Sequence, residues 1–102
     1  MKLYKGYDAT HEWLFFCPGC ECAHFFNTKT WSWNGSMDKP TISPSILMMG
    51  GIREDTKGED RCHSFVRDGR IQFLSDCSHK LAGQTVDIPE WESVYGVKEA
   101  VK

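Results

Sequence analysis

The sequence predicts a small, mainly β domain (at most α+β, with one or two short helices) that a bound metal ion stabilises. Three observations lead to this prediction. Short aromatic or alternating segments recur along the chain, turn dipeptides separate them, and Cys17-Pro18-Gly19-Cys20 places two thiols on one tight turn. A Cys-x-x-Cys of this kind supplies half of the ligands of a tetrahedral zinc site.

The segments on either side of this cysteine turn have the composition of strands. Residues 12–17 (EWLFFC) and 23–28 (AHFFNT) are rich in aromatic residues, which pack well on the pleated surface of a sheet. We therefore expect a zinc knuckle, in which two strands flank the Cys-x-x-Cys turn.

The middle of the chain contains weaker strand signals. Residues 30–33 (TWSW) alternate bulky and small side chains and end at Asn34-Gly35, a strong turn dipeptide. Two prolines in residues 39–45 (KPTISPS) favour an extended edge segment over a central strand. Residues 46–49 are apolar, whereas residues 50–61 are polar, charged and punctuated by glycine, which predicts a mobile loop.

The strongest strand signal is a β-hairpin at residues 62–75. Its two strands bracket Asp68-Gly69, the pair favoured in a two-residue type I′ turn. Because side chains alternate between the two faces of a strand, this register predicts two pairs on opposite faces. The pairs are Cys62 with Cys77 on one face, and His63 with Asp76 on the other.

The helix signals are confined to the end of the chain. Pro89 is suited to the first position of a helix over residues 89–95, and Gly96 interrupts that helix. We expect at most one or two short helices in the chain.

Composition and charge exclude several classes of function. A net charge of −2, with 12 basic and 14 acidic residues and no basic run, argues against general nucleic-acid binding. No segment has the length of a membrane span, and no apolar leader is visible. Five cysteines, an odd number, favour thiolates on a metal in a reducing cytoplasm over a disulfide framework. We therefore expect one cytoplasmic zinc-binding domain over residues 1–102.

A zinc ion would need four protein ligands in a structural site. The alternative for each cysteine is a buried free thiol, and the second half of the chain has no Cys-x-x-Cys of its own. Metal binding would add folding free energy to a chain of a length at which hydrophobic burial only narrowly outweighs chain entropy. The predicted ligands are Cys17, Cys20, Cys62 and Cys77, with His24 or His79 as substitutes.

The polar residues allow a second interpretation. His63 and Asp76 on one hairpin face could form a general acid/base pair, or a purely structural hydrogen bond. The polar groups of the central segment could bind backbone groups of loops or line a pocket, and we favour binding to loops. These residues are Trp33, Asn34, Thr41, Ser43 and Ser45.

Long stretches of the chain resemble a family of small phage and prophage proteins. The resemblance rests on Trp33-Asn34-Gly35, on residues 40–45 (PTISPS) and on residues 62–79 (CHSFVRDGRIQFLSDCSH), and it covers residues 17–91. Members often carry the label "ammonia monooxygenase", which does not fit because such an enzyme is membrane-bound and built differently. The resemblance implies a phage-encoded, zinc-binding accessory protein, and related domains lie near ubiquitin-like conjugation genes in bacteria.

The family's motifs can be transferred residue by residue. They fall on Cys17, Cys20 and His24, on Cys62 and His63, and on Asp76, Cys77 and His79. Cys22 lies outside the pattern, so we do not expect it to be a ligand.

These observations lead to two functional hypotheses. The first is a phage accessory protein in the host cytoplasm that binds a host protein or a small nucleotide-like ligand, with a counter-defence role and one structural zinc. The alternative is a zinc-dependent or His/Asp-based hydrolase, in which His63 and Asp76 are catalytic. The number of protein ligands separates the two, because a catalytic zinc keeps an open position for water.

Overall fold

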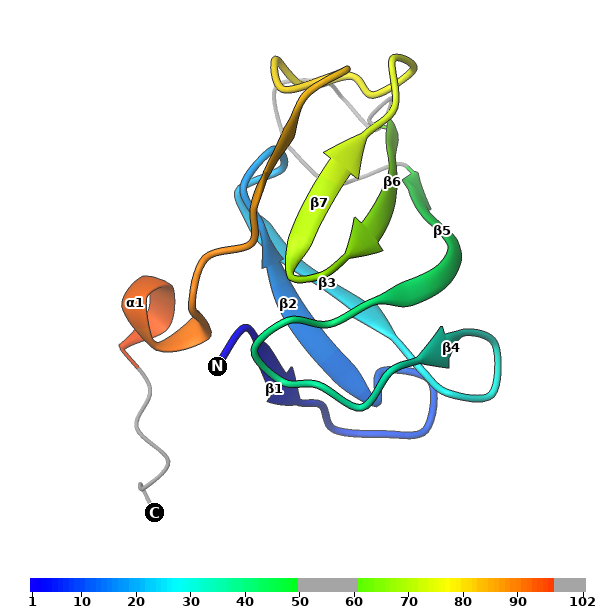
Figure 1. Ribbon diagram of the computed structural model, residues 1–102, viewed down its shortest axis with the longest axis vertical. Helices are drawn as coiled ribbons and strands as arrows, with labels where there is room; N and C mark the ends of the chain where they lie inside the picture. Colours follow the sequence, from blue (N-terminus) through cyan, green and yellow to red (C-terminus); the bar gives the residue numbers. More distant parts are fainter. Residues whose placement is uncertain (50–60, 97–102) are drawn as a thin grey trace.

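The computed structural model describes residues 1–49 and 61–96 as two antiparallel sheets and one short helix (Figure 1), which confirms the mainly β prediction. The first sheet has the order β1-β2-β3 and the second has the order β4-β5-β6-β7-β8. The first contains β1 (Leu3–Lys5), β2 (Trp13–Cys17) and β3 (Cys22–Phe26). The second contains β4 (Ser32–Trp33), β5 (Ile42–Met49), β6 (Arg61–Arg67), β7 (Arg70–Phe73) and β8 (Thr85–Asp87), and helix α1 (Trp91–Tyr95) follows it.

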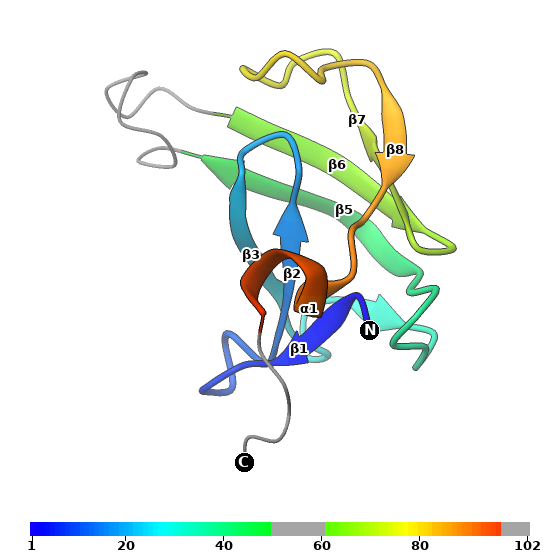
Figure 2. The same cartoon turned by 90° about the vertical axis from the view of Figure 1, so that its left-hand side faces the viewer.

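The core lies between the two sheets. Figure 2 shows β5 and β6 crossing above β2 and β3, with α1 beside β1 and β2. Each sheet sends alternate side chains into the shared interior and the intervening ones toward solvent, as half-buried strands do. The largest fully buried side chains include Phe15, Phe26, Phe73, Ile42, Ile46, Ile71 and Val66.

The zinc-knuckle topology predicted at the N-terminal end is present. Strands β2 and β3 pair from Trp13↔Phe26 to Cys17↔Cys22, so the Cys-x-x-Cys turn joins them. Within the turn, the N–H of Cys20 donates to Sγ of Cys17 at 3.4 Å, and the N–H of Glu21 donates to the carbonyl of Cys17 at 2.7 Å. These bonds fold the turn around the first sulfur.

The predicted hairpin is confirmed in both its turn and its register. Arg67 pairs with Arg70, and Asp68 and Gly69 have φ values of 53° and 79°. Positive φ at both central positions is the type I′ geometry that Asp-Gly favours. The hairpin consists of β6 and β7.

The proline-rich segment differs from the prediction of an edge segment over residues 39–45. Ile42 already belongs to β5, which lies between β4 and β6 in the sheet. The register with β6 shifts here: β5 advances four residues from Ile42 to Ile46 while β6 advances two, from Val66 to Ser64. Pro44, which has no N–H, falls in this irregularity, where the ladder does not require its N–H.

Helix α1 ends at Gly96, which adopts the left-handed conformation with φ 67°, as expected of a glycine after a helix. Strands β1 and β8 were not predicted. The loop predicted at residues 50–61 lies, except for Arg61, outside the described residues.

Candidate active site and metal centre

Three polar side chains form a hydrogen-bonded chain on the outward face of the five-stranded sheet. Oγ of Ser45 lies 3.0 Å from Nε2 of His63, and Nδ1 of His63 lies 3.4 Å from Oδ2 of Asp76. A carboxylate only accepts hydrogen bonds, so Nδ1 of His63 carries the proton and Nε2 accepts from the Ser45 hydroxyl. Hydroxyl, imidazole and carboxylate therefore stand in the order found in the catalytic triads of serine hydrolases.

The bulge in β5 positions the serine. Ile42 and Ile46 both face the interior, so Ser45, the residue before Ile46, faces outward beside β6. The indole N–H of Trp31 donates to the carbonyl of Ser45 at 3.2 Å and fixes its backbone from the other side. Bulges are common beside active sites because they redirect a side chain.

The hairpin positions the histidine and the acid. His63 lies on β6, and Asp76 follows β7 after a turn in which the N–H of Leu74 donates to the carbonyl of His63 at 2.9 Å. Arg61 also reaches the carboxylate, with Nη1 3.3 Å from Oδ2 of Asp76. This arrangement confirms that His63 and Asp76 share a face.

The electrostatics of the site keep the acid ionised. Desolvation acts to raise the pKa of Asp76, but the hydrogen bonds from His63 and Arg61 lower that pKa below its ordinary value. An ionised Asp76 can stabilise the imidazolium that forms when His63 takes a proton. The side chains of His63 and Asp76 are 28% and 40% exposed, so a substrate can reach them.

Directly beneath this chain, on the inward face of the same sheet, lies a cluster of metal-ligating side chains. Cys17, Cys20, His24 and Cys62 are all buried, and their ligand atoms lie within 4.8 Å of one another. Sγ of Cys17 and Sγ of Cys62 are 3.8 Å apart. The cluster joins the two sheets, because three members come from β2, β3 and their turn and the fourth from β6.

The histidine of the cluster is oriented as a metal ligand. Nδ1 of His24 lies 3.2 Å from the carbonyl of Ala23, whereas the buried Nε2 has no hydrogen-bond partner among the described atoms. Ligating histidines commonly use one nitrogen for the metal and the other for a backbone carbonyl. Three thiols with such an imidazole therefore fit a metal ion.

Hydrogen bonding within the cluster shifts the pKa values of its thiols in opposite directions. Hydrogen bonds from Cys20 and Cys62 lower the pKa of Cys17, and the same contact raises the pKa of Cys20. Burial acts to lower the pKa of His24, but the surrounding thiols outweigh it and raise that pKa to about 12. The cluster thus favours positive charge in its centre.

Cys77 and His79 fall in a second group rather than with the first four. Their ligand atoms lie within 4.8 Å of each other and of Cys62, which belongs to both groups. Sγ of Cys77 accepts from the N–H of His63 at 3.3 Å and lies 3.2 Å from its carbonyl oxygen. The sulfur of Cys77 therefore holds the backbone of His63. Cys22 lies in neither group.

Sequence reasoning missed Ser45 as a functional residue. We expected its hydroxyl to bind a loop, yet it points at His63. The PTISPS motif drew attention to Ser45, but the motif does not reveal that the hydroxyl contacts His63, which lies 18 residues further along the chain. The bulge in β5, which no sequence pattern predicted, brings Ser45 and His63 together.

A comparison with protein families bears on this geometry. The model of the family described as "Bacterial ubiquitination-like system serine protease (BubE)" matches residues 1–74, most of the chain. The chain belongs to the BubE family. The matched stretch includes Ser45 and His63 and ends two residues before Asp76. Comparisons with curated proteins and with solved structures gave no match.

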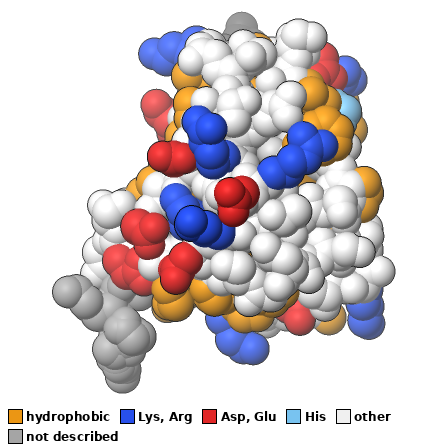
Figure 3. Space-filling model, in the orientation of Figure 1, with side chains coloured by type: hydrophobic (Ala, Val, Ile, Leu, Met, Phe, Trp, Pro, Cys, Tyr) orange, Lys and Arg blue, Asp and Glu red, His pale blue; other side chains and the backbone are white. Residues whose placement is uncertain are grey.

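The face of the protein drawn in Figure 3 is mixed in charge. Figure 3 shows basic and acidic side chains interspersed on one face, in keeping with the net charge of −2. Within residues 1–49 and 61–96, no helix has the length and apolar character needed to cross a membrane.

Proposed function

We propose that this protein is a serine peptidase of a bacterial ubiquitination-like system, with Ser45 as nucleophile, His63 as general base and Asp76 as the orienting acid. The observation that carries the proposal is the continuous chain from Oγ of Ser45 through His63 to the carboxylate of Asp76. Membership of the BubE family supports the same reaction class. The proposal develops the hydrolase alternative, with a serine in place of a metal-bound water.

The reaction follows from the geometry. As Oγ of Ser45 attacks a peptide carbonyl carbon, Nε2 of His63 takes the hydroxyl proton and Asp76 stabilises the resulting imidazolium. His63 then gives this proton to the leaving amine as the C–N bond breaks, which leaves an ester on Ser45. A water molecule, deprotonated by His63, hydrolyses the ester and restores the Ser45 hydroxyl.

We further propose that the buried cluster holds a structural zinc ion, with Cys17, Cys20, Cys62 and His24 as its ligands. Three thiolates and one imidazole make a closed tetrahedral set, which leaves no position for a water nucleophile. Zinc would fix the position of Cys62, next to His63 in the chain, and would take no part in the proton transfers. In this ligand set His24 replaces Cys77 of the predicted one.

The test is covalent labelling of the nucleophile. A fluorophosphonate probe reacts with serines that a neighbouring base activates, so the wild-type protein should be labelled at Ser45 and the Ser45→Ala variant should not. Ser43→Ala is the matched control, because Ser43 is an exposed serine on the same strand. Peptide mapping of the adduct by mass spectrometry identifies the site. Absence of a Ser45 adduct in folded wild-type protein would contradict the proposal.

A phage origin, a counter-defence role and binding of a host protein or nucleotide-like ligand stay predictions. They are compatible with a peptidase, because a peptidase also has to recognise a partner protein. None of them is needed for the reaction described here.

A further inference from the structure

Strand β5, which carries Ser45, is paired with β4 along only part of one of its two edges. Strand β4 pairs with β5 at Ser43 and Ile42 alone, whereas β5 continues to Met49 along β6. In Figure 1 this far half of β5 forms the right-hand border of the sheet. The backbone groups on that border follow from the ladder.

The hairpin register fixes which groups face outward. Arg67 and Arg70 flank the two-residue turn and are hydrogen-bonded to each other, so the backbone groups of Arg67 point toward β7. Successive residues of a strand direct their backbone groups to opposite sides, so every second residue from Arg67 also points toward β7. The residues between them, including Ser64 and Cys62, direct their backbone groups toward β5. Their partners Ile46 and Met48 therefore bond β6, and the N–H and C=O of Leu47 point away from it. The Trp31 bond to the Ser45 carbonyl, on the same side as Leu47, agrees with this alternation.

The outward backbone of Leu47 is unpaired in the part of the chain that the structure describes: no hydrogen bond joins its N–H or C=O to any described residue. A pair of unpaired strand groups is a template for another extended chain. Leu47 lies two positions from Ser45, with Ile46 between them, a distance of about 6.8 Å along a strand. A chain paired with Leu47 would thus reach the Ser45 hydroxyl within two residues.

We propose that the substrate is an extended, unfolded polypeptide segment that adds to the edge of β5 through the backbone of Leu47 and so presents a peptide carbonyl to Ser45. This inference rests on the serine-peptidase proposal and names its substrate class. Trp31 ends the ladder at Ser45 by occupying the carbonyl there. The substrate backbone has to leave the edge at this point, and its next peptide group becomes accessible to Oγ of Ser45.

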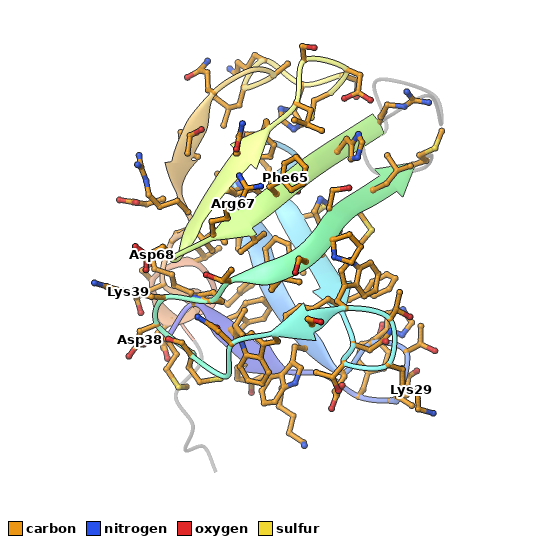
Figure 4. All side chains as sticks on the ribbon, turned by 45° about the vertical axis from the view of Figure 1, so that its right-hand side comes forward. Lys29, Asp38, Lys39, Phe65, Arg67 and Asp68 are labelled. Carbon is orange, nitrogen blue, oxygen red and sulfur yellow. The ribbon has the colours of Figure 1, made fainter. Side chains whose placement is uncertain are left out.

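The side chains beside this edge predict an apolar preference. Leu47 pairs with His63 across the ladder, and its side chain is 48% exposed on the outward face. Residues directly opposite each other in adjacent strands project to the same face, so the substrate residue opposite Leu47 lies against it. On the other side of His63, Phe65 lies on the same face of β6 with the Arg67 guanidinium 4.5 Å from its ring centre (Figure 4).

The experiment compares cleavage of a peptide library with labelling of the nucleophile. The wild-type protein, Leu47→Pro and Leu47→Val are incubated with a proteome-derived peptide library, and cleavage is read by mass spectrometry. Leu47→Pro removes the outward N–H and no bond to β6, a position where strands tolerate proline. We expect it to cleave about tenfold or more slowly than wild type, with unchanged fluorophosphonate labelling of Ser45. Leu47→Val keeps the outward N–H and should therefore cleave faster than Leu47→Pro.

A second measurement uses the wild-type protein and avoids any folding defect of the proline variant. The best-cleaved library peptide is N-methylated at one position at a time. Because the substrate residue paired with Leu47 donates its N–H to the Leu47 carbonyl, we expect cleavage to fall when that residue is N-methylated and to be retained when a residue adjacent to it is. Cleavage by Leu47→Pro at the wild-type rate, or equal tolerance of N-methylation at every position, would overturn the inference. So would labelling of Ser45 without cleavage of any library peptide, whereas loss of labelling in the wild type would reject the peptidase itself.

Discussion

At the scale of single residues, the orientation of His63 decides whether the site can work. Its Nδ1 proton has to stay on the Asp76 side so that Nε2 remains an acceptor for Ser45. The carboxylate achieves this because it only accepts hydrogen bonds, and its lowered pKa keeps it ionised.

Replacing the carboxylate by an amide tests this role. We expect Asp76→Asn to lower kcat by about 10⁴-fold, because a neutral amide neither fixes the tautomer nor stabilises the imidazolium. The bound metal should remain, since Asp76 lies in neither metal group. Rates come from ester hydrolysis or probe labelling, and metal content from elemental analysis. Asp87→Asn is the control, because Asp87 is a carboxylate on β8 that pairs with Arg70. A kcat of Asp76→Asn close to the wild-type value would remove Asp76 from the site.

At the scale of elements, the hairpin of β6 and β7 positions both partners of the serine. Its turn could be predicted because the signal is local: Asp68-Gly69 occupies the two positive-φ positions by itself. The assignment of Cys62 and His63 to opposite faces of β6 followed from the alternation of side chains along a strand alone. Register is well specified here because one face is buried.

The glycine of this turn provides a stability test. Gly69→Val should lower the free energy of unfolding by about 1–2 kcal/mol or more, because a β-branched residue strongly disfavours positive φ. A Cβ at this position would also lie 3.1 Å from the backbone oxygen of Asp38. Urea denaturation measures the loss, with Arg70→Lys as an exposed control in the same hairpin. Equal midpoints for the two variants would mean that the turn contributes little.

Other elements were missed for physical reasons. Strands β1 and β8 have three residues each, so they carry no periodic signal and depend on the neighbours they pair with. The bulge in β5 was missed because two prolines argue against a central strand, whereas the sheet accommodates Pro44 by shifting register. The position of Ser45 depends on that bulge, so the complete site could not be predicted.

The candidate metal ligands also divide into those that the local sequence predicts and those that depend on distant contacts. Cys17 and Cys20 follow from their spacing on one turn. The choice between His24 and Cys77 does not, because it depends on how the two sheets pack. The fold places His24 on β3 among the first group, and Cys77 beside the His63 backbone.

At the scale of the whole molecule, the four-residue cluster connects the two sheets at their interface. Cys17, Cys20 and His24 belong to the three-stranded sheet and its turn, and Cys62 belongs to the five-stranded sheet. Cys62 directly precedes His63, so the four-residue cluster and the hydrogen-bonded chain of Ser45, His63 and Asp76 occupy opposite faces of one strand. Loss of the metal should therefore affect folding and reactivity together.

Chelation tests this coupling. Structural zinc sites contribute about 10 kcal/mol or more of binding free energy, which is comparable with the whole stability of a small domain, about 5–15 kcal/mol. We expect a strong chelator to abolish the cooperative thermal transition seen by circular dichroism and to abolish probe labelling of Ser45 at the same chelator concentration. Added zinc should restore both. The Ser45→Ala variant is the control, because it should bind metal and unfold like the wild type while remaining unlabelled. An unchanged thermal transition in protein shown by elemental analysis to be metal-free would mean that packing alone holds the two sheets together.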